Sequence, residues 1–120
     1  EVGFSACNQE QFDKGITYLK QTVAKVKFIS FEPLLGGIDL SRKPMEISFI
    51  VIGAQTRPTV LPRIEWVREI VEACDRAGIP IWLKNNLSQH WGGNLPEESL
   101  LYSHDENGLH LRHELPKGEA

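Results

Sequence analysis

The segment Ile47-Ser48-Phe49-Ile50-Val51-Ile52-Gly53 is the most strand-like part of the sequence and decides the fold class. Its residues are apolar nearly throughout, which is typical of a strand buried on both faces of a parallel sheet. Gly78 and Pro80 mark the end of a helix, and residues 79–83 then have the pattern of a further strand. The apolar face of this helix consists of Ile64, Val67, Ile70, Val71 and Cys74. The order strand, helix, strand predicts a βαβ unit.

The residues before this segment repeat the pattern. A strand is predicted at residues 2–7, and Asn8 with Gln11 has the capping-box signature of a helix start. Four apolar residues then recur at intervals of three and four, which predicts a helix: Phe12, Ile16, Leu19 and Val23. A second strand, residues 26–31, ends before Pro33, which cannot continue a ladder of backbone hydrogen bonds. Four parallel strands with right-handed crossovers are therefore expected.

The helical cover of this sheet is incomplete. Residues 32–46 show no convincing helix beyond one turn around residues 39–42, and the two clear helices would lie on one side of the sheet. Parallel strands need cover on both faces, and a complete (β/α) barrel takes about 250 residues. Because the sequence also begins with glutamate directly at a strand, we expect an α/β fold that is one half of a TIM-like (β/α) barrel cut from a longer chain.

Residues 93–120 are expected to form an extension of the half-barrel in residues 1–92. Asn107-Gly108 is a turn signal between the apolar residues 100–102 and 109–111, which predicts a β-hairpin. The half-barrel would expose apolar sheet surface. Its expected partner is therefore the missing amino-terminal half, and without that half the chain should associate with itself.

The composition excludes several classes of protein. Thirteen basic and sixteen acidic residues give a net charge of -3, so no excess of positive charge is available for a nucleic acid partner. No apolar run approaches the roughly 20 residues that span a bilayer, and no signal peptide is visible, so we expect a cytoplasmic protein without a membrane partner. Cys7 and Cys74 belong to no CxxC pair, although one disulfide stays arithmetically open, and the four histidines lack metal-ligand spacing. We therefore expect no metal in this chain.

Polar residues follow each predicted strand at its carboxyl end, where parallel α/β proteins place their functional sites. A carboxylate there can bind an ammonium group while a cation binds a carboxylate, which predicts a site for a small polar or zwitterionic ligand. The alternative is a structural role, in which Glu32 pairs with Arg57 or Lys84. The candidate ligand-binding residues are Asn8, Ser30, Glu32, Gln55, Arg57, Lys84 and Asn85.

A further observation is the order of four segments, which are Glu32-Pro33-Leu34-Leu35-Gly36, Ile38-Asp39-Leu40, residues 47–53 and residues 66–84. Together they resemble the carboxy-terminal half of a phage-associated protein family of unknown function that is similar to radical S-adenosylmethionine (radical SAM) enzymes. The resemblance covers residues 2–92, and the first segment is its strongest element. It implies a barrel whose amino-terminal half carries three cysteines that hold a 4Fe-4S cluster, which cleaves S-adenosylmethionine.

This chain departs from the family pattern. The three cysteines are absent, so the resemblance assigns the cluster and S-adenosylmethionine to the full-length parent and no cofactor to this chain. A glutamate that usually precedes the first strand-end asparagine is replaced by Cys7, before Asn8, and a Gly-Gly-Glu-Ser segment appears as Gly53-Ala54-Gln55-Thr56. A Lys-Gln-Trp-Gly segment appears as Lys84-Asn85-Asn86-Leu87. Two carboxylates that could contact the cofactor are lost, which indicates a divergent branch.

Three functions follow from these observations. On the resemblance, the chain is a fragment of a radical SAM-like protein that contributes ligand-facing strand ends, is inactive alone and has an unknown substrate. A second hypothesis is a barrel enzyme in which Lys84 forms a Schiff base with a carbonyl substrate, as in class I aldolases. A third is a non-catalytic binding or assembly domain, which the lost carboxylates favour. Fold alone does not decide among them, and no residue is assigned a catalytic role.

Overall fold

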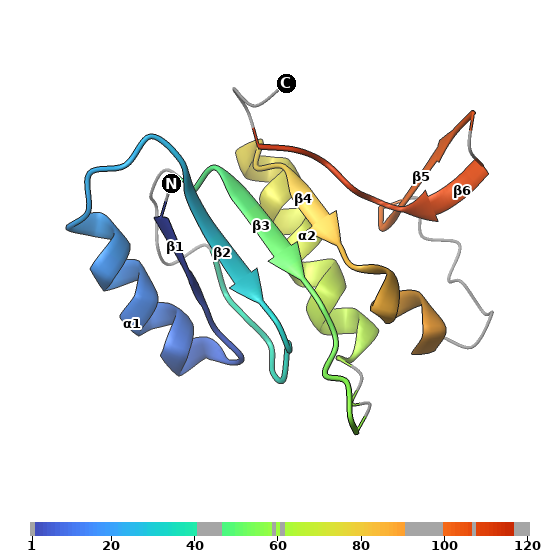
Figure 1. Ribbon diagram of the computed structural model, residues 1–120, viewed down its shortest axis with the longest axis horizontal. Coiled ribbons are helices and arrows are strands. Elements are labelled where there is room, and N and C mark those ends of the chain that lie inside the picture. The colour runs from blue at the N-terminus through green and yellow to red at the C-terminus, as the bar shows by residue number, and fades with distance from the viewer. Residues whose placement is uncertain are drawn as a thin grey trace.

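The computed structural model describes residues 2–40, 47–58, 60, 62–90, 100–106 and 108–116 (Figure 1). Within them, a sheet of parallel strands has the order β1-β2-β3-β4. Its strands are β1 (Val2–Ser5), β2 (Lys27–Phe31), β3 (Phe49–Ile52) and β4 (Ile81–Leu83). Helix α1 (Gln9–Lys20) connects β1 to β2, and α2 (Ile64–Ala77) connects β3 to β4. The predicted α/β fold with four parallel strands is confirmed.

Helix α1 begins as its sequence predicts and ends earlier. The Asn8 side chain accepts a hydrogen bond from the Gln11 N–H at 3.0 Å, and the Gln11 side chain accepts one from the Cys7 N–H at 2.7 Å. The prediction that Val23 continues the apolar stripe is wrong, because the helix ends at Lys20 and Val23 is 102% exposed. The Thr22 hydroxyl bonds to Tyr18 O, and such local side-chain bonds compete with helix continuation.

Helix α2 follows its sequence pattern closely. Val67, Ile70, Val71 and Cys74 are fully buried, and burial of each of the three aliphatic side chains among them stabilises the fold by roughly 1.5–3 kcal/mol. Gly78 ends the helix in the left-handed region, at φ 72° and ψ 29°, and its neighbour Ile79 donates an N–H to Cys74 O at 2.8 Å.

Both cysteines are free, so the disulfide that the count left open is absent.

The connection between β2 and β3 contains no helix in its described part, residues 32–40. Part of the turn considered around residues 39–42 lies outside the described residues. Leu34 and Ile38 of this connection are buried in the same core as the two helices. The prediction that a helix is missing here is confirmed for residues 32–40.

The two faces of the sheet have different surroundings. The face under α1 and α2 is fully buried and contains Ile29, Phe31, Ile50, Ile52, Ile81 and Leu83. The alternate residues are only half-buried, and we call their side the open face: Phe28, Ser30, Phe49, Val51 and Trp82. The expectation of burial on both faces is thus met on one face only. Figure 1 looks onto the open face, with α2 behind β3 and β4 and α1 beside β1.

The tail forms the predicted hairpin. β5 (Tyr102–Asp105) and β6 (Gly108–Leu111) are antiparallel, with Asp105 opposite Gly108. The first strand of the hairpin therefore begins and ends later than the apolar residues 100–102. The second strand begins one residue before the apolar residues 109–111. Leu101, Tyr102 and Leu111 belong to the same core as the sheet. The extension therefore packs on the parallel sheet.

Residues 112–114 continue from the hairpin along the outer edge of β4. The Leu83 N–H donates to Arg112 O at 2.8 Å, and the Glu114 N–H donates to Ile81 O at 2.9 Å. Trp82 and His113 form an antiparallel bridge between these bonds. The hydrogen-bonding edge of β4 is therefore occupied by the tail of the same chain.

Candidate functional site

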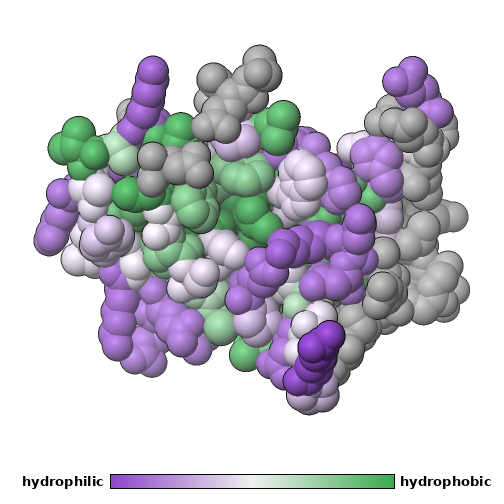
Figure 2. Space-filling model, viewed as in Figure 1, coloured by the Kyte–Doolittle hydropathy of each residue, from purple (hydrophilic) through white to green (hydrophobic). Residues whose placement is uncertain are grey.

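Three residues stand in a row where β2, β3 and β4 end. Ser30 pairs with Val51, and Val51 pairs with Trp82. Two residues further along each strand, this register aligns three positions, which are Glu32, Gly53 and Lys84. Side chains two residues apart on a strand point to the same face, so this carboxyl-end row belongs to the open face. In Figure 2, drawn in the same view as Figure 1, hydrophilic side chains gather near the arrowheads of these strands, and apolar ones gather over the sheet toward the amino ends of the strands.

Glu32 and Lys84 form an ion pair across the row. The Lys84 Nζ lies 2.5 Å from Oε2 of Glu32, and the Ser30 hydroxyl donates to Oε1 of the same carboxylate at 3.3 Å. The Lys84 side chain is 42% exposed and that of Glu32 is 32% exposed, so water reaches both charges. The pair is electrically neutral as a whole, and each charge stays accessible from the open face.

Gly53 makes room for this pair. A Cβ atom at Gly53 would lie 3.1 Å from Glu32 Cγ and 3.2 Å from Lys84 Cδ, closer than ordinary van der Waals contact. The Gly53 backbone is itself fixed, because its N–H donates to Phe31 O and its carbonyl accepts from the Leu34 N–H. A side chain at this position would therefore crowd the two side chains that form the pair, which would have to shift by a few tenths of an ångström.

An aromatic stack borders the row. The Trp82 ring lies parallel to the His113 ring, with centroids 4.3 Å apart and an interplanar angle of 10°. His113 Nε2 lies 2.9 Å from Leu83 O, which orients the imidazole. The sequence pattern assigned no role to His113, one of the four histidines without metal-ligand spacing. The structure places it beyond β6, and no local sequence signal indicates a pairing with a strand thirty residues away.

Two other predicted residues lie in the loop after β3. The Gln55 amide donates to Pro58 O at 3.2 Å, and the Gln55 backbone pairs with Val60. Arg57 is exposed and has a φ of 60°, a left-handed conformation that is uncommon for a residue with a side chain. The structure pairs Glu32 with Lys84, so of the two structural partners considered for Glu32 the lysine is the one observed.

The remaining predicted residues have local roles. The Asn8 side-chain oxygen caps α1, and Asn85 begins the short 3₁₀ helix η1 (Asn85–His90). Its neighbour Asn86, which was not among the predicted ligands, bonds to both backbone groups of Ala54 at 3.1 and 3.2 Å. These bonds hold the end of β3 against η1. Of the seven candidates, the structure brings Ser30, Glu32 and Lys84 into contact.

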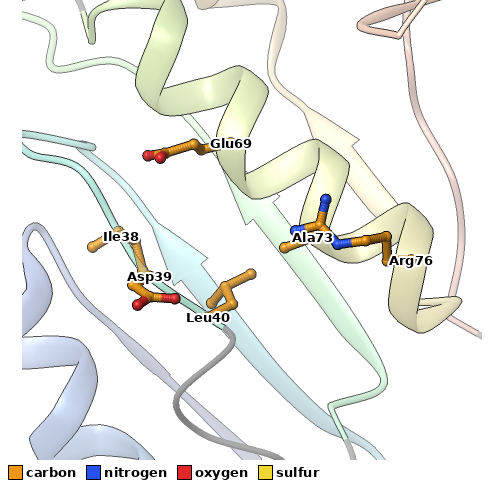
Figure 3. Close-up of a pocket in the computed structure, with 6 residues that line it drawn as sticks. All are labelled: Ile38, Asp39, Leu40, Glu69, Ala73 and Arg76. Carbon is orange, nitrogen blue, oxygen red and sulfur yellow. The ribbon is translucent and has the colours of Figure 1, made fainter.

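A separate hollow lies on the helix-covered side. It has a volume of about 200 Å³ and is bounded by the loop after β2 and one side of α2 (Figure 3). Its lining residues are Ile38, Asp39, Leu40, Glu69, Ala73 and Arg76. Because Glu32 and Lys84 lie on the opposite face of the sheet, this hollow is not part of the carboxyl-end row.

The cysteines of this chain do not fit an iron–sulfur cluster. Burial raises the pKa of the Cys74 thiol to about 12, and cluster ligands must be thiolates. Only Cys7 is partly accessible, whereas three cysteines would be needed. Among the described residues, no three histidine, cysteine, aspartate or glutamate side chains come together in a way that could hold a metal ion.

The fold and the row together define a class of protein: an α/β protein with a parallel sheet and an ion pair at the carboxyl ends of its strands. The model of one family, described as "Protein of unknown function (DUF5131)", matches residues 1–116. The chain belongs to this family. No curated protein matches the chain, and neither does any solved structure. No helix in the described residues is long and apolar enough to cross a membrane.

Proposed function

We propose that this chain supplies the ligand-facing part of a larger (β/α) barrel of the radical SAM-like type, with Glu32 and Lys84 at its mouth. The observation that carries the proposal is that both side chains stand at carboxyl strand ends on the face that α1 and α2 leave open. In a (β/α) barrel the helices cover the outside, and ligands bind at the carboxyl ends of the strands. The open face corresponds to the inside of such a barrel.

The composition along the open face supports this orientation. Phe28 and Phe49 lie opposite each other toward the amino ends of their strands, whereas the ion pair lies at the carboxyl ends. The Phe28 ring also covers Gly3, where a Cβ would lie 2.6 Å from two ring atoms. An interior with aromatic rings at one end and charges at the other has a packed base and a polar mouth.

The remaining strands of this barrel would be added beside β1. The edge of β4 is occupied by residues 112–114, so a parallel strand has no place there. The N–H groups of Val2 and of Ala6, which follows β1, point toward β2 and bond to Val26 O and Ser30 O. The N–H groups of Gly3 and Ser5 therefore point toward the outer edge. Strand β1 carries no charge and no proline, the features that usually protect exposed edges. The barrel would consequently stay open beside β4.

The cofactors of the parent would be held by its other part. The resemblance to radical SAM enzymes implies a 4Fe-4S cluster and S-adenosylmethionine, and a bound cluster of that kind supplies the electron for reductive cleavage of the cofactor. The cysteines of this chain do not fit the cluster. Its own residues would therefore bind and orient a small polar ligand at the mouth, and the substrate is not assigned.

The Schiff-base hypothesis for Lys84 receives less support from the geometry. A Schiff base forms from a neutral amine, usually in an apolar pocket. The Lys84 Nζ instead bonds to the Glu32 carboxylate, and the Lys84 side chain is partly exposed. Borohydride trapping of Lys84 with carbonyl compounds tests this alternative directly.

The proposal is tested by hydrogen exchange at the free edge. The polypeptide encoded immediately upstream of this chain in its gene is expressed together with it, and amide exchange is compared with that of the chain alone. We expect the Gly3 and Ser5 amides to become protected, because a parallel strand would accept their hydrogen bonds. The Leu83 amide, already bonded to Arg112 O, is the internal control and should not change. Unchanged exchange at Gly3 and Ser5 would refute the barrel.

A further inference from the structure

We infer that the carboxyl-end row binds a zwitterion that carries a primary ammonium and a carboxylate next to an apolar group, as an apolar or aromatic α-amino acid does. The inference rests on the proposed function for the face that the ligand occupies. It adds the chemical class of the ligand.

The two opposite charges of the row favour a ligand that carries both a positive and a negative charge. Glu32 and Lys84 are 2.5 Å apart at their closest atoms, so any ion at one of them lies close to the other. An anion at Lys84 alone would be repelled by Glu32, and a cation at Glu32 alone would be repelled by Lys84. A zwitterion presents its ammonium to the carboxylate and its carboxylate to the ammonium, which leaves no charge unpaired when water is excluded.

The existing ion pair does not prevent such a ligand from entering. Ion pairs that are partly exposed contribute little to stability, so their separation costs little. The Ser30 hydroxyl already bonds to Oε1 of Glu32 and would keep that carboxylate oriented when Lys84 turns to the ligand. Gly53 lies between the two side chains and carries no Cβ, so no side chain of β3 obstructs a ligand that separates the two charged groups.

The surface behind the row fits an apolar group. Val51 and Trp82 are neighbours on the open face. They precede Gly53 and Lys84 by two residues, toward the amino ends of β3 and β4. Both are half-buried, and the Trp82 ring is held in place by its stack on His113. A side chain attached to the zwitterion would extend over these two residues. The site therefore has a charged end and an apolar end, in the order of an amino acid.

The test uses four probes with the 120-residue chain, since every residue of the site lies in it. L-Phenylalanine is compared with 3-phenylpropanoate, which lacks the ammonium, with phenethylamine, which lacks the carboxylate, and with glycine, which lacks the apolar group. Binding is followed by NMR shifts of the Gly53 and Lys84 amides and of the Trp82 indole. We expect L-phenylalanine to bind about tenfold or more tightly than each of the other probes.

Two variants assign each charge to its partner. Glu32→Gln should remove the preference for L-phenylalanine over 3-phenylpropanoate, and Lys84→Met should remove the preference over phenethylamine. The matched controls are Glu10→Gln and Lys14→Met, which remove the charges of an exposed ion pair on α1 and should leave both preferences intact. If 3-phenylpropanoate or phenethylamine binds as tightly as L-phenylalanine, or if the variants leave the preferences unchanged, the inference is overturned.

The two proposals fail in different ways. If no probe shifts the site although Gly3 and Ser5 become protected by the upstream polypeptide, the ligand class is wrong and the barrel stands. If L-phenylalanine binds with the expected preferences while these amides stay unprotected, the ligand class is supported and the barrel is refuted.

Discussion

Gly53 is the residue on which the geometry of the candidate site depends most directly. We predict that Gly53→Ala weakens binding of L-phenylalanine about tenfold, because the added methyl group would push Glu32 and Lys84 apart. The NMR titration described above measures the loss. Gly37→Ala is the matched control: its Cβ would lie 3.5 Å from Trp66, an ordinary contact, so binding should not change. Equal binding by both variants would show that the gap at Gly53 has no role.

The charges of Glu32 and Lys84 should matter for binding and little for stability. We predict that Glu32→Gln and Lys84→Met each change the free energy of unfolding by about 1 kcal/mol or less, because both side chains are partly exposed. Thermal denaturation followed by circular dichroism measures this. A much larger loss of stability in either variant would indicate that the pair is a structural ion pair, which is the alternative to a ligand site.

The two cysteines should differ in reactivity. Burial raises the pKa of Cys74 from 9.0 to about 12, so at pH 8 its thiol is protonated and covered, whereas Cys7 is partly accessible. We predict that the folded chain titrates one thiol with DTNB and the unfolded chain two. Cys7→Ser should abolish the reaction of the folded chain, and rapid reaction of both thiols in that state would contradict the packing of α2.

The same burial makes stability depend on pH. Since the pKa of Cys74 is raised in the folded state, its contribution is fully present below about pH 9 and is lost as the pH rises toward 12. We predict that denaturation midpoints fall over this range and fall less steeply in Cys74→Ala. Parallel curves for the two proteins would show that the thiol does not ionise on unfolding.

At the scale of elements, Arg112 joins the tail to the parallel sheet. Its guanidinium bonds to both carboxylate oxygens of Asp75 at 2.8 and 3.1 Å, to Glu114 and to Leu100 O, and its side chain is only 13% exposed. The hydrogen bonds that the guanidinium donates to Asp75 and Glu114 raise the pKa of Arg112 above its already high usual value. A guanidinium group with this many hydrogen-bond partners fixes the segment that covers the edge of β4.

We predict that Arg112→Met destabilises the chain by about 2 kcal/mol, because two carboxylates and one carbonyl lose their partner. The Leu83 amide, which donates to Arg112 O, should then exchange faster. Arg63→Met removes an exposed ion pair with Glu65 and serves as the control, with a change near zero. If the Leu83 amide stays protected in Arg112→Met, the tail is held by its backbone bonds and its buried residues alone.

At the scale of the whole molecule, the open face and the free edge of β1 predict self-association. Phe28, Phe49 and Val51 give this face an apolar centre, and within the described residues β1 is an edge strand whose outer hydrogen-bonding groups face no other strand. We predict that sedimentation of the chain depends on concentration and that Val51→Lys shifts it toward the monomer. Val23→Lys, at an exposed site away from the sheet, should have no effect. A well-behaved wild-type monomer would argue against the half-barrel.

The local elements of this molecule follow from the sequence alone. Asn8 with Gln11 determines where α1 begins, and Gly78 determines where α2 ends, because each acts on backbone groups a few residues away. Apolar periodicity likewise identifies the buried side of α2, since a helix buries residues three and four apart. The strand positions and the polar character of their carboxyl ends were predictable for the same reason.

Only the tertiary structure decided which of these polar residues meet. Glu32, Gly53 and Lys84 come from three strands, and their alignment depends on a register set by packing between strands distant in sequence. The pairing of His113 with Trp82 and of Arg112 with Asp75 has the same origin. Sequence patterns report the neighbours of a residue along the chain, whereas contacts across a sheet arise from the free energy of the folded whole. This is why the choice of Lys84 over Arg57 as the partner of Glu32, and the covered edge of β4, became visible only in the structure.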